Sequence, residues 1–249
     1  MFDTLKSRIY QGNQAIPDIE KAVIDEKFRG LPLISTHNCS NCSNCISVCP
    51  TNAINHGLSI DLGKCIFCGD CERECPTNTI KFTDFYKISS TSRENLIVYS
   101  NTTQEAYKAT AIKSSEQIKK IFGRSLKLRQ VSAGGCNGCE MELNACSNVN
   151  FDMGRFGIDI VASPRHADGI IITGPITENM ATALEDAYLS TPDPKVIILV
   201  GACAISGGIF KNSDAIKRDF LEKYKIDLYI PGCPIHPLTF INGLLSFLK

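Results

Sequence analysis

The stretch from Cys39 to Pro50, "CSNCSNCISVCP", decides the first third of the chain, because the stretch from Cys65 to Pro76, "CIFCGDCERECP", repeats it. Each cysteine of the second stretch lies 26 positions after its counterpart in the first. Both stretches have the spacing C-x2-C-x2-C-x3-C-P. A fixed offset of this kind indicates an internal duplication rather than chance clustering.

The spacing suits iron-sulfur chemistry. Three thiolates on one tight loop can bind three corners of an iron-sulfur cube, and a short helix turns the fourth away. In two-cluster ferredoxins that fourth cysteine binds the other cluster. We therefore expect two [4Fe-4S] clusters, one on Cys39, Cys42, Cys45 and Cys75, the other on Cys65, Cys68, Cys71 and Cys49.

A pair of zinc sites and a set of disulfides are the alternatives. Zinc ribbons commonly use two C-x2-C pairs separated by a longer loop, not a triple with a trailing Cys-Pro. From about Leu31 to Phe82 the sequence resembles a bacterial-type two-cluster ferredoxin. Residues 1–83 are therefore expected to form a ferredoxin domain of the α+β class, with an N-terminal extension.

Composition limits the class of protein. The 249 residues include 26 Lys plus Arg and 26 Asp plus Glu, a balance that does not favour nucleic acid as a partner. The first residues lack the apolar core of a signal peptide, and the longest apolar run, "KVIILVGACAI", is too short to cross a bilayer. Thirteen cysteines in a reducing compartment then point to metal, and the odd total leaves at least one without a metal role.

A connector is expected over residues 84–120. It is rich in Ser, Thr, Asn and Lys, with one short apolar run, "LIVYS", that could form a strand. The spacing of Ile118, Ile121, Phe122 and Leu126 indicates a short amphipathic helix at the start of the next domain.

Residues 121–249 alternate between strand and helix patterns. This alternation predicts an α/β domain with a parallel sheet covered on both faces. The expected strands are Leu126 to Val131, Ile158 to Ala162, Ile170 to Thr173, Val196 to Val200 and Asp227 to Ile230, and the expected helices are Thr177 to Leu189, Asp214 to Tyr224 and Pro237 to Leu248.

One connection is too short for this scheme. Only "SPRHAD" separates the second and third expected strands, whereas a parallel crossover normally needs about a dozen residues. Either the strand at Ile158 lies at an edge in another direction, or one boundary is wrong.

Four further cysteines follow expected strands. Cys136 and Cys139 follow the first, Cys203 the fourth and Cys233 the fifth. Ligands of open α/β sheets collect beyond the carboxyl ends of the strands, so these four are expected to hold a third [4Fe-4S] cluster. Alternatively, the C-x2-C pair is a redox dithiol and the other two are ordinary buried or loop cysteines. Cys146 has no partner and is expected to be a packed helix residue.

Four blocks carry a second resemblance: "FGRSLKLRQVSAGGCNGCEMELNA", "SPRHADGIIITGPIT", "GACAISGGIF" and "PGCPIHP". They resemble the small subunit of membrane-bound group 4 [NiFe] hydrogenases, such as formate hydrogenlyase, and the related 20 kDa subunit of complex I. The resemblance implies a flavodoxin-like domain whose proximal cluster is held by the four cysteines. "MFDTLKSRIYQG" and "FRGLPLI" resemble the separate ferredoxin subunit of the same complexes, so the chain looks like a fusion of two neighbouring subunits.

The resemblance implies an electron-transfer subunit, with the NiFe centre on a separate large subunit. No C-x2-C pairs are left over for a NiFe site on this chain. Complex I subunits carry adjacent cysteines at the first ligand position, whereas Cys136 and Cys139 are two residues apart, which favours a hydrogenase. A quinone oxidoreductase subunit and a stand-alone ferredoxin-type carrier are the alternatives.

The implied partners are the large subunit, further soluble and membrane subunits, and a donor such as formate dehydrogenase, CO dehydrogenase or ferredoxin. The implied location is cytoplasmic, peripheral on the inner face of the membrane through partner subunits.

The same resemblance gives roles to acidic and basic residues near the blocks. It implies that Glu140 or Glu142 assists proton movement near the large subunit, with Glu142 the better match. Alternatively, these acids only favour the start of a helix. The resemblance places Arg165 and His166 near the cluster, a solvated turn being the alternative. His236 is expected to cap the last helix.

Overall fold

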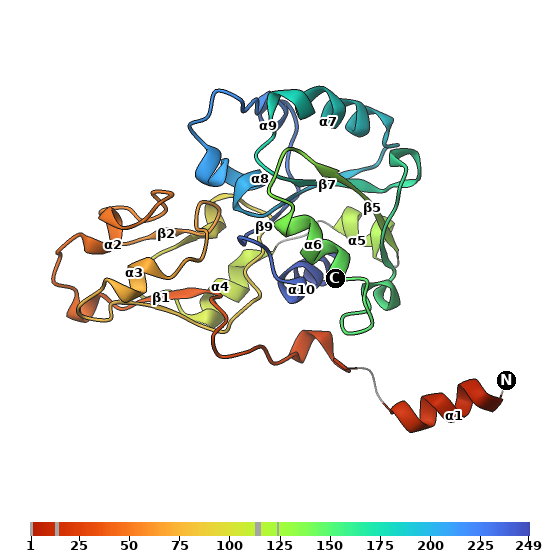
Figure 1. The fold of residues 1–249 in the computed structure, drawn as a ribbon, viewed down its shortest axis with the longest axis horizontal. Coiled ribbons are helices and arrows are strands. Elements are labelled where there is room, and N and C mark those ends of the chain that lie inside the picture. The colour runs from red at the N-terminus through yellow and green to blue at the C-terminus, as the bar shows by residue number, and fades with distance from the viewer. Residues whose placement is uncertain (1, 13–14, 113–115, 124) are drawn as a thin grey trace.

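The computed structural model describes residues 2–12, 15–112, 116–123 and 125–249. A smaller N-terminal domain of loops and short strands lies beside a larger C-terminal domain built on a parallel sheet (Figure 1). The predicted fold class is thereby confirmed.

The C-terminal sheet has five parallel strands in the order β6-β5-β7-β8-β9. Numbered within the domain, this is the order 2-1-3-4-5 of flavodoxin-like folds. All five predicted strands are present. Their bounds are β5 Leu126–Ser132, β6 Ile158–Ile160, β7 Gly169–Thr173, β8 Val196–Val200 and β9 Leu228–Ile230.

Both faces of the sheet are covered, as continuous apolar strands require. Side chains alternate along a strand: Ile170 and Ile172 belong to the apolar cluster on the face of α7 and α9, while Ile171 and Ile198 belong to the cluster on the face of α6 and α10. Figure 1 shows these two helical layers above and below the sheet. The helices are α5 Glu116–Phe122, α6 Gly138–Ala145, α7 Glu178–Ser190, α8 Ala202–Ser206, α9 Asp219–Lys223 and α10 Pro237–Leu248, with single turns η4 Met153–Phe156, η5 Pro164–His166 and η6 Gly208–Phe210.

The short connection before β7 is explained by register. β6 lies at the sheet edge, as one alternative proposed, but it runs parallel to β5 and not in another direction. Ile160, the last residue of β6, pairs with Leu128, and so does Gly169, the first residue of β7. Because β6 ends at the level where β7 begins, the chain needs only the single turn η5 to pass from one to the other.

The helix predicted from Asp214 to Tyr224 is only half present, since α9 begins at Asp219. The residues before it bond to the segment that precedes α7, where Ile216 forms an antiparallel bridge with Thr177. The Glu178 amide donates to the carbonyl of Ala215 at 2.8 Å, and the Lys217 amide donates to that of Ile176 at 2.9 Å. These bonds use backbone groups that a longer helix would need.

The N-terminal domain contains two small antiparallel pairs, β1 with β3 and β2 with β4. One short helix in each repeat contains the third cysteine of the triple, Cys45 in the first and Cys71 in the second. The elements are α1 Phe2–Gln11, η1 Ile19–Lys21, β1 Pro32–Ile34, η2 Thr36–Asn38, α2 Asn44–Ser47, β2 Ile60–Asp61, α3 Asp70–Arg73 and β3 Ile80–Phe82.

The connector is bonded to both domains through its backbone. Its strand β4 (Ile97–Val98), the one suggested by "LIVYS", pairs with β2. Ser90 and Tyr229 of β9 exchange two backbone hydrogen bonds of 2.9 and 2.8 Å. The remaining connector elements are η3 Glu94–Leu96 and α4 Gln104–Ala111.

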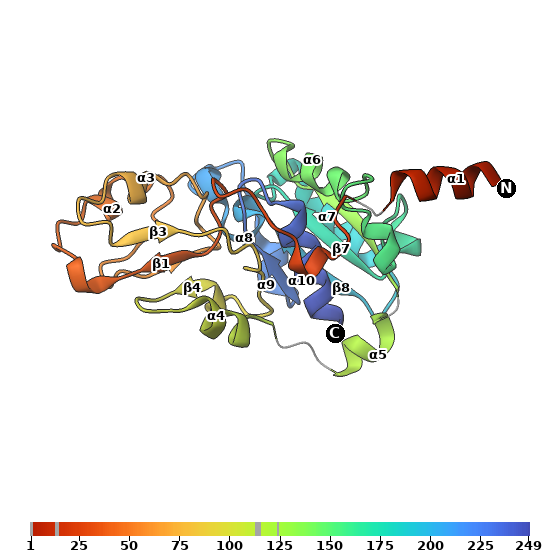
Figure 2. The ribbon, with the colours of Figure 1, turned by 90° about the horizontal axis from the view of Figure 1, so that it is seen from below.

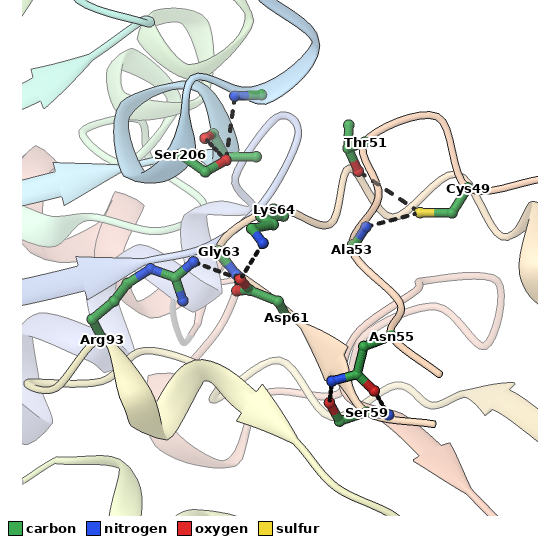
Figure 3. A network of polar contacts seen from close by, with 12 residues as sticks. Cys49, Thr51, Ala53, Asn55, Ser59, Asp61, Gly63, Lys64, Arg93 and Ser206 are labelled. Atoms are coloured by element: carbon green, nitrogen blue, oxygen red, sulfur yellow. Dashed lines mark hydrogen bonds and ion pairs between the residues drawn. The ribbon is translucent and has the colours of Figure 1, made fainter. Parts of the chain in front are cut away.

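The two domains also share one apolar cluster. Gly63, after β2, lies so close to the C-terminal domain that an added Cβ would be 2.7 Å from Ile205 Cγ2 in α8. Arg93 of the connector donates to Asp61 Oδ2 at 2.6 Å, and Asp61 Oδ1 accepts from the Gly63 amide at 2.9 Å (Figure 3). The approach of Gly63 to Ile205 places the N-terminal domain against α8, the helix that carries Cys203.

The N-terminal extension follows the C-terminal domain and then leaves it. Asn242 of α10 donates to the carbonyl of Ile19 at 3.0 Å, whereas α1 projects away from the rest of the molecule (Figures 1 and 2). Within the described residues, none of the helices combines the length and the apolar character that a bilayer crossing needs.

The core of the C-terminal domain can be tested at Leu244, which is fully buried in α10. We expect Leu244→Ala to lower the free energy of unfolding by about 3 kcal/mol, because it removes buried apolar atoms and leaves a cavity. Leu189→Ala is the matched control, since Leu189 is 64% exposed in α7. Urea unfolding followed by circular dichroism measures both, and equal effects would contradict the packing described.

Candidate iron-sulfur sites

The first predicted set of cysteines surrounds one cavity of the N-terminal domain, here called cysteine site 1. The cavity measures about 100 Å³, and the side chains of His56, Leu58 and Thr77 also line it. Its four cysteines are Cys39, Cys42, Cys45 and Cys75.

The second set surrounds a separate cavity, cysteine site 2, which is lined mainly by apolar groups, among them Ile54, Ile60 and Phe82. Its four cysteines are Cys49, Cys65, Cys68 and Cys71. In both sites the structure therefore brings the fourth cysteine of one repeat to the triple of the other. This is the exchange that the spacing predicted.

The sequence repeat is also a repeat of backbone conformation. The left-handed conformation, uncommon for residues other than glycine, recurs at the same offset of 26 positions in both cysteine loops. It lets each loop turn tightly enough to present three sulfurs to one cavity. The pairs are Asn41 with Phe67, Ser43 with Gly69 and Asn52 with Asn78.

The fourth cysteine of each repeat receives the same hydrogen bond. The Ala53 amide donates to Cys49 Sγ at 3.2 Å, and the Thr79 amide donates to Cys75 Sγ at 3.2 Å. Figure 3 shows the first of these, together with the contact of Cys49 with the Thr51 hydroxyl. Amides aimed at sulfur stabilise a thiolate and are among the groups that set the potential of an iron-sulfur cluster.

Hydrogen bonds of this kind lower the pKa of the Cys75 thiol. Burial raises the pKa of its thiol, but bonds from the Thr79 and Thr77 backbone and hydroxyl groups outweigh burial and lower it to about 7. In site 2, burial alone dominates and raises the pKa of Cys65 and of Cys71, the latter to about 12.

Cysteine site 3 lies at the carboxyl ends of the C-terminal strands, as predicted. Cys136 and Cys139 follow β5, Cys203 lies in α8 after β8, and Cys233 follows β9. The thiols lie close enough to act electrostatically on one another: Cys203 and Cys233 raise the pKa of Cys139, and Cys136 raises that of Cys203 and of Cys233. Three separate loops thus bring the four sulfurs together.

Glycine makes room for the sulfurs of site 3. A Cβ at Gly201, whose φ is +89°, would lie 2.6 Å from Cys139 Sγ. A Cβ at Gly208, whose φ is +54°, would lie 3.0 Å from Cys203 Sγ. A side chain at either position would occupy the space beside a thiol.

The donor set of site 3 fits a cationic metal group. Burial raises the pKa of Cys139 to about 12 and that of Cys203 to about 11. Metal ligation needs thiolates, and a bound metal deprotonates a coordinating thiol. Among the described residues, no group of three or more His, Cys, Asp or Glu is arranged to hold a single metal ion. A four-iron cube has a wider ligand arrangement, because each thiolate binds a different iron.

Glu140 has a defined structural position. Its side chain is only 6% exposed, and Oε1 accepts from Ser132 Oγ at 2.7 Å and from Thr173 Oγ1 at 2.6 Å. These hydroxyls end β5 and β7, so the carboxylate ties the start of α6 to the two strands beside Cys139.

Glu142 lies one residue beyond Met141 on α6 and is partly exposed. Burial raises the pKa of its carboxyl group. Its backbone carbonyl accepts from Cys146 Sγ at 3.2 Å, and Cys146 is fully buried, so Cys146 is the packed helix cysteine that was expected.

The placement of Arg165 and His166 near the cluster is wrong. Both belong to η5, which precedes β7, and they line an open groove with Lys127 and Asp168. That groove lies at the amino ends of the parallel strands, whereas the cysteines follow the carboxyl ends. A motif in the same sequence block can thus lie at the opposite end of the sheet. His236 caps α10 as predicted, with Nδ1 accepting from the Leu238 amide at 3.1 Å.

The three sites adjoin in series. Cys45 of site 1 acts electrostatically on Cys71 of site 2. Phe67, in the site 2 loop, and Cys233 of site 3 line one cavity of about 200 Å³. Arg29 also lines it and donates to the Phe67 carbonyl at 2.6 Å. Site 2 is therefore the middle one.

Several residues that line or support these sites lie outside the cysteine motifs. His56 lines site 1, Arg29 bonds the site 2 loop, and Arg218 bonds the site 3 loop. No spacing rule marks a single His or Arg that comes from a distant element, so the sequence offered no signal for them.

Comparison with known proteins finds matches to two family models. Residues 32–55 and 58–81 match the model of the 4Fe-4S binding domain. Residues 136–247 match the model of the family "NADH ubiquinone oxidoreductase, 20 Kd subunit".

Among curated relatives, the "Probable membrane-bound hydrogenase subunit mbhJ" of Pyrococcus furiosus is 37% identical over 133 residues, which are 53% of this chain and 80% of that protein. The chain belongs to the 20 kDa subunit family. This confirms the predicted recognition, and members of the family are subunits of oxidoreductases.

Other members come from hydrogen and quinone enzymes alike. "Formate hydrogenlyase subunit 7" of Escherichia coli is 44% identical over 51% of this chain and 49% of its own length. A subunit of the NADH-quinone oxidoreductase of Bacteroides thetaiotaomicron is 41% identical over 50% of this chain and 64% of its own length. A solved structure of an archaeal membrane-bound sulfane sulfur reductase covers 53% of this chain and 73% of its matching chain, with 32% identity and a TM-score of 0.45.

The glycine beside Cys139 provides a test of site 3. We expect Gly201→Ala to remove the metal of site 3 and to leave that of sites 1 and 2, because the methyl group would occupy the space beside Cys139 Sγ. If each of the three sites holds one cubane, iron should fall from about twelve to about eight per chain, four for each cubane. Gly154→Ala, where the nearest atom would be 3.7 Å away, is the control. Iron and sulfide analysis after anaerobic purification measures both, and full iron in Gly201→Ala would contradict this geometry.

Proposed function

We propose that this chain is the electron-transfer subunit of a membrane-associated [NiFe] hydrogenase complex, and that it relays electrons through three [4Fe-4S] clusters. The NiFe site would lie on a separate large subunit, where protons and dihydrogen interconvert. The observation that carries the proposal is the series of three four-cysteine sites with site 2 in the middle.

Each site would hold one cluster, which when bound takes up and releases one electron. Site 1 is the outer site, and site 3, at the sheet rim, would face the large subunit. The protein controls the order of the sites. The close approach of Gly63 to Ile205 places the N-terminal domain against α8, which carries Cys203, and the bond from Arg93 to Asp61 joins that domain to the connector.

The exposure of residues around site 3 also supports a partner subunit on that side. Cys136 and Cys233 are exposed, and Met141 and Ile209, on the elements that carry site 3 cysteines or follow them, are 64% and 62% exposed. Large apolar side chains at a partly open metal site are suited to burial by a partner subunit. We assign that partner to the catalytic large subunit.

The relatives that are similar to this chain include subunits of hydrogenases and of NADH-quinone oxidoreductases. The choice between the two reactions must therefore come from a feature of the chain itself. The two-residue gap between Cys136 and Cys139 is the feature that favours a hydrogenase. A complex I-like quinone oxidoreductase subunit is the second candidate, and the similarity to the NADH-quinone oxidoreductase subunit of Bacteroides thetaiotaomicron favours it.

The remaining partners follow from the proposed complex. Electrons would enter from formate dehydrogenase, CO dehydrogenase or ferredoxin, and further soluble and membrane subunits would hold the chain at the inner face of the cytoplasmic membrane. A stand-alone ferredoxin-type carrier is the rival outside the enzyme class. Such a carrier would purify alone, whereas the proposed subunit should co-purify with a large subunit and membrane proteins.

The ligand set of site 3 is tested by two serine substitutions. Cys203→Ser should lower iron from about twelve to about eight per chain, because it removes one of four ligands of a cubane. Cys146→Ser should leave iron unchanged, since the Cys146 thiol is fully buried and donates to the Glu142 carbonyl. Iron analysis and electron paramagnetic resonance (EPR) of the reduced protein compare the two variants. Equal iron in both would refute a third cluster on these cysteines.

The reaction is tested in the assembled complex. We expect dihydrogen evolution with a low-potential electron donor, measured by gas chromatography, and quinone reduction without dihydrogen would favour the second candidate. In the same assay, Glu142→Gln should slow evolution severalfold if this partly exposed carboxyl group moves protons. Asp186→Asn, a change at another acid on a helix of the C-terminal domain, is the control. Unchanged evolution in Glu142→Gln would remove the proton role.

A further inference from the structure

Arg218 is a cation that lies beside site 3 and donates hydrogen bonds to backbone carbonyls. It is the residue just before α9, and its guanidinium group is partly buried. It donates to three backbone carbonyls: Nη1 to Pro175 at 2.9 Å and to Cys203 at 3.1 Å, and Nη2 to Ala204 at 2.6 Å. No ion pair to a carboxylate forms at Arg218 among the residues that the structure describes.

Such an arrangement is costly in the protein alone. A guanidinium group removed from water loses hydration, and neutral carbonyls compensate only part of that loss. Burial accordingly lowers the pKa of Arg218, whereas the neighbouring Cys203 acts in the opposite direction. Cys203, a residue of site 3, is therefore a group whose negative charge would favour the charged form of Arg218.

The effect is mutual. Burial and the thiols of Cys233 and Cys136 raise the pKa of Cys203, and the positive charge of Arg218 opposes this rise. Glu140, also near Cys203, adds to the rise. Its carboxylate accepts hydrogen bonds from the hydroxyls of Ser132 and Thr173.

The three carbonyl bonds fix the position of the charge. Ala204 and Cys203 belong to α8, the helix that contains the cysteine itself, and Pro175 follows β7. Arg218 is therefore held to the backbone of a ligand residue and cannot turn toward solvent without breaking these bonds. A charge held in a partly buried place is screened by water and salt less than an exposed one.

We propose that Arg218 is the counter-charge of the cluster at site 3 and that it raises the reduction potential of this cluster above the value it would have without the arginine. This inference rests on the proposed function, in which Cys136, Cys139, Cys203 and Cys233 hold that cluster. Reduction adds one negative charge to the cluster, so a fixed positive charge stabilises the reduced form more than the oxidised form. Arg218 would thus favour electron transfer from site 2 to site 3.

The test is an EPR-monitored redox titration of the full chain, purified anaerobically with its clusters. The signal of site 3 is assigned by its absence from Cys203→Ser. In Arg218→Gln we expect the site 3 midpoint to move to a more negative potential, with at least a threefold change in the ratio of oxidised to reduced cluster at a given potential. This is about 30 mV, since tenfold corresponds to about 59 mV for a one-electron couple. The midpoints of sites 1 and 2 should stay within a third of that shift.

Two further variants separate charge from structure. Arg218→Lys keeps the charge, so its site 3 midpoint should stay near the wild-type value. Lys217→Gln removes one positive charge from the neighbouring exposed residue and should leave the midpoint unchanged. If Arg218→Gln loses the site 3 iron, a normal cluster with the wild-type midpoint in Arg218→Lys still supports the charge role.

Three results would overturn the inference. They are an unchanged midpoint in Arg218→Gln, an equal shift in Arg218→Gln and Arg218→Lys, and loss of site 3 iron in both variants, which would show that only the geometry of the guanidinium bonds matters. Failure of the proposed function would look different, because the wild-type chain itself would then contain about eight irons instead of about twelve.

Discussion

Parallel pairing of β5, β7, β8 and β9 is the constraint on which site 3 depends. Because these strands run in one direction, the loops after β5, β8 and β9 emerge at the same rim, and their cysteines meet there although almost a hundred positions separate the first from the last. A reversed strand would send one ligand to the other end of the sheet. Arg165 and His166 illustrate this, since they precede β7 and lie at the amino ends.

A second constraint is electrostatic. Each site gathers thiols in a partly apolar setting, and burial there opposes ionisation, as the raised pKa values of Cys71, Cys139 and Cys203 show. Each site opposes this effect of burial on thiol ionisation with different polar or charged groups. Site 1 uses amide and hydroxyl donors to Cys75, site 2 uses amides to Cys49 and Cys65, and site 3 adds the guanidinium group of Arg218. Three sites with similar ligands thus have different surroundings, and surroundings are what set the potentials of such clusters.

Contact between the domains turns separate sites into a series. The connector pairs β4 with β2 on one side and Ser90 with Tyr229 on the other, so the ferredoxin-like domain is held against the sheet rim by backbone hydrogen bonds. The close approach of Gly63 to Ile205 needs a residue without a side chain at the joint. If the chain is a fusion of two neighbouring subunits, this contact between domains would replace the interface that holds two separate chains together.

Local patterns along the chain were enough to predict the cysteine sets and the alternation of strands and helices, because ligand spacing and apolar period are properties of short segments. The exchange of Cys49 and Cys75 was predicted from the match of this spacing to two-cluster ferredoxins, in which the fourth cysteine of each repeat binds the other cluster. The direction of β6, the shortening of α9, the order of the three sites and the place of Arg218 became known only from the folded chain. Each of these depends on contacts between backbone groups that are distant in the sequence. For example, the Lys217 amide bonds the Ile176 carbonyl instead of continuing a helix. The spacing of residues along the chain carries no information about such long-range contacts.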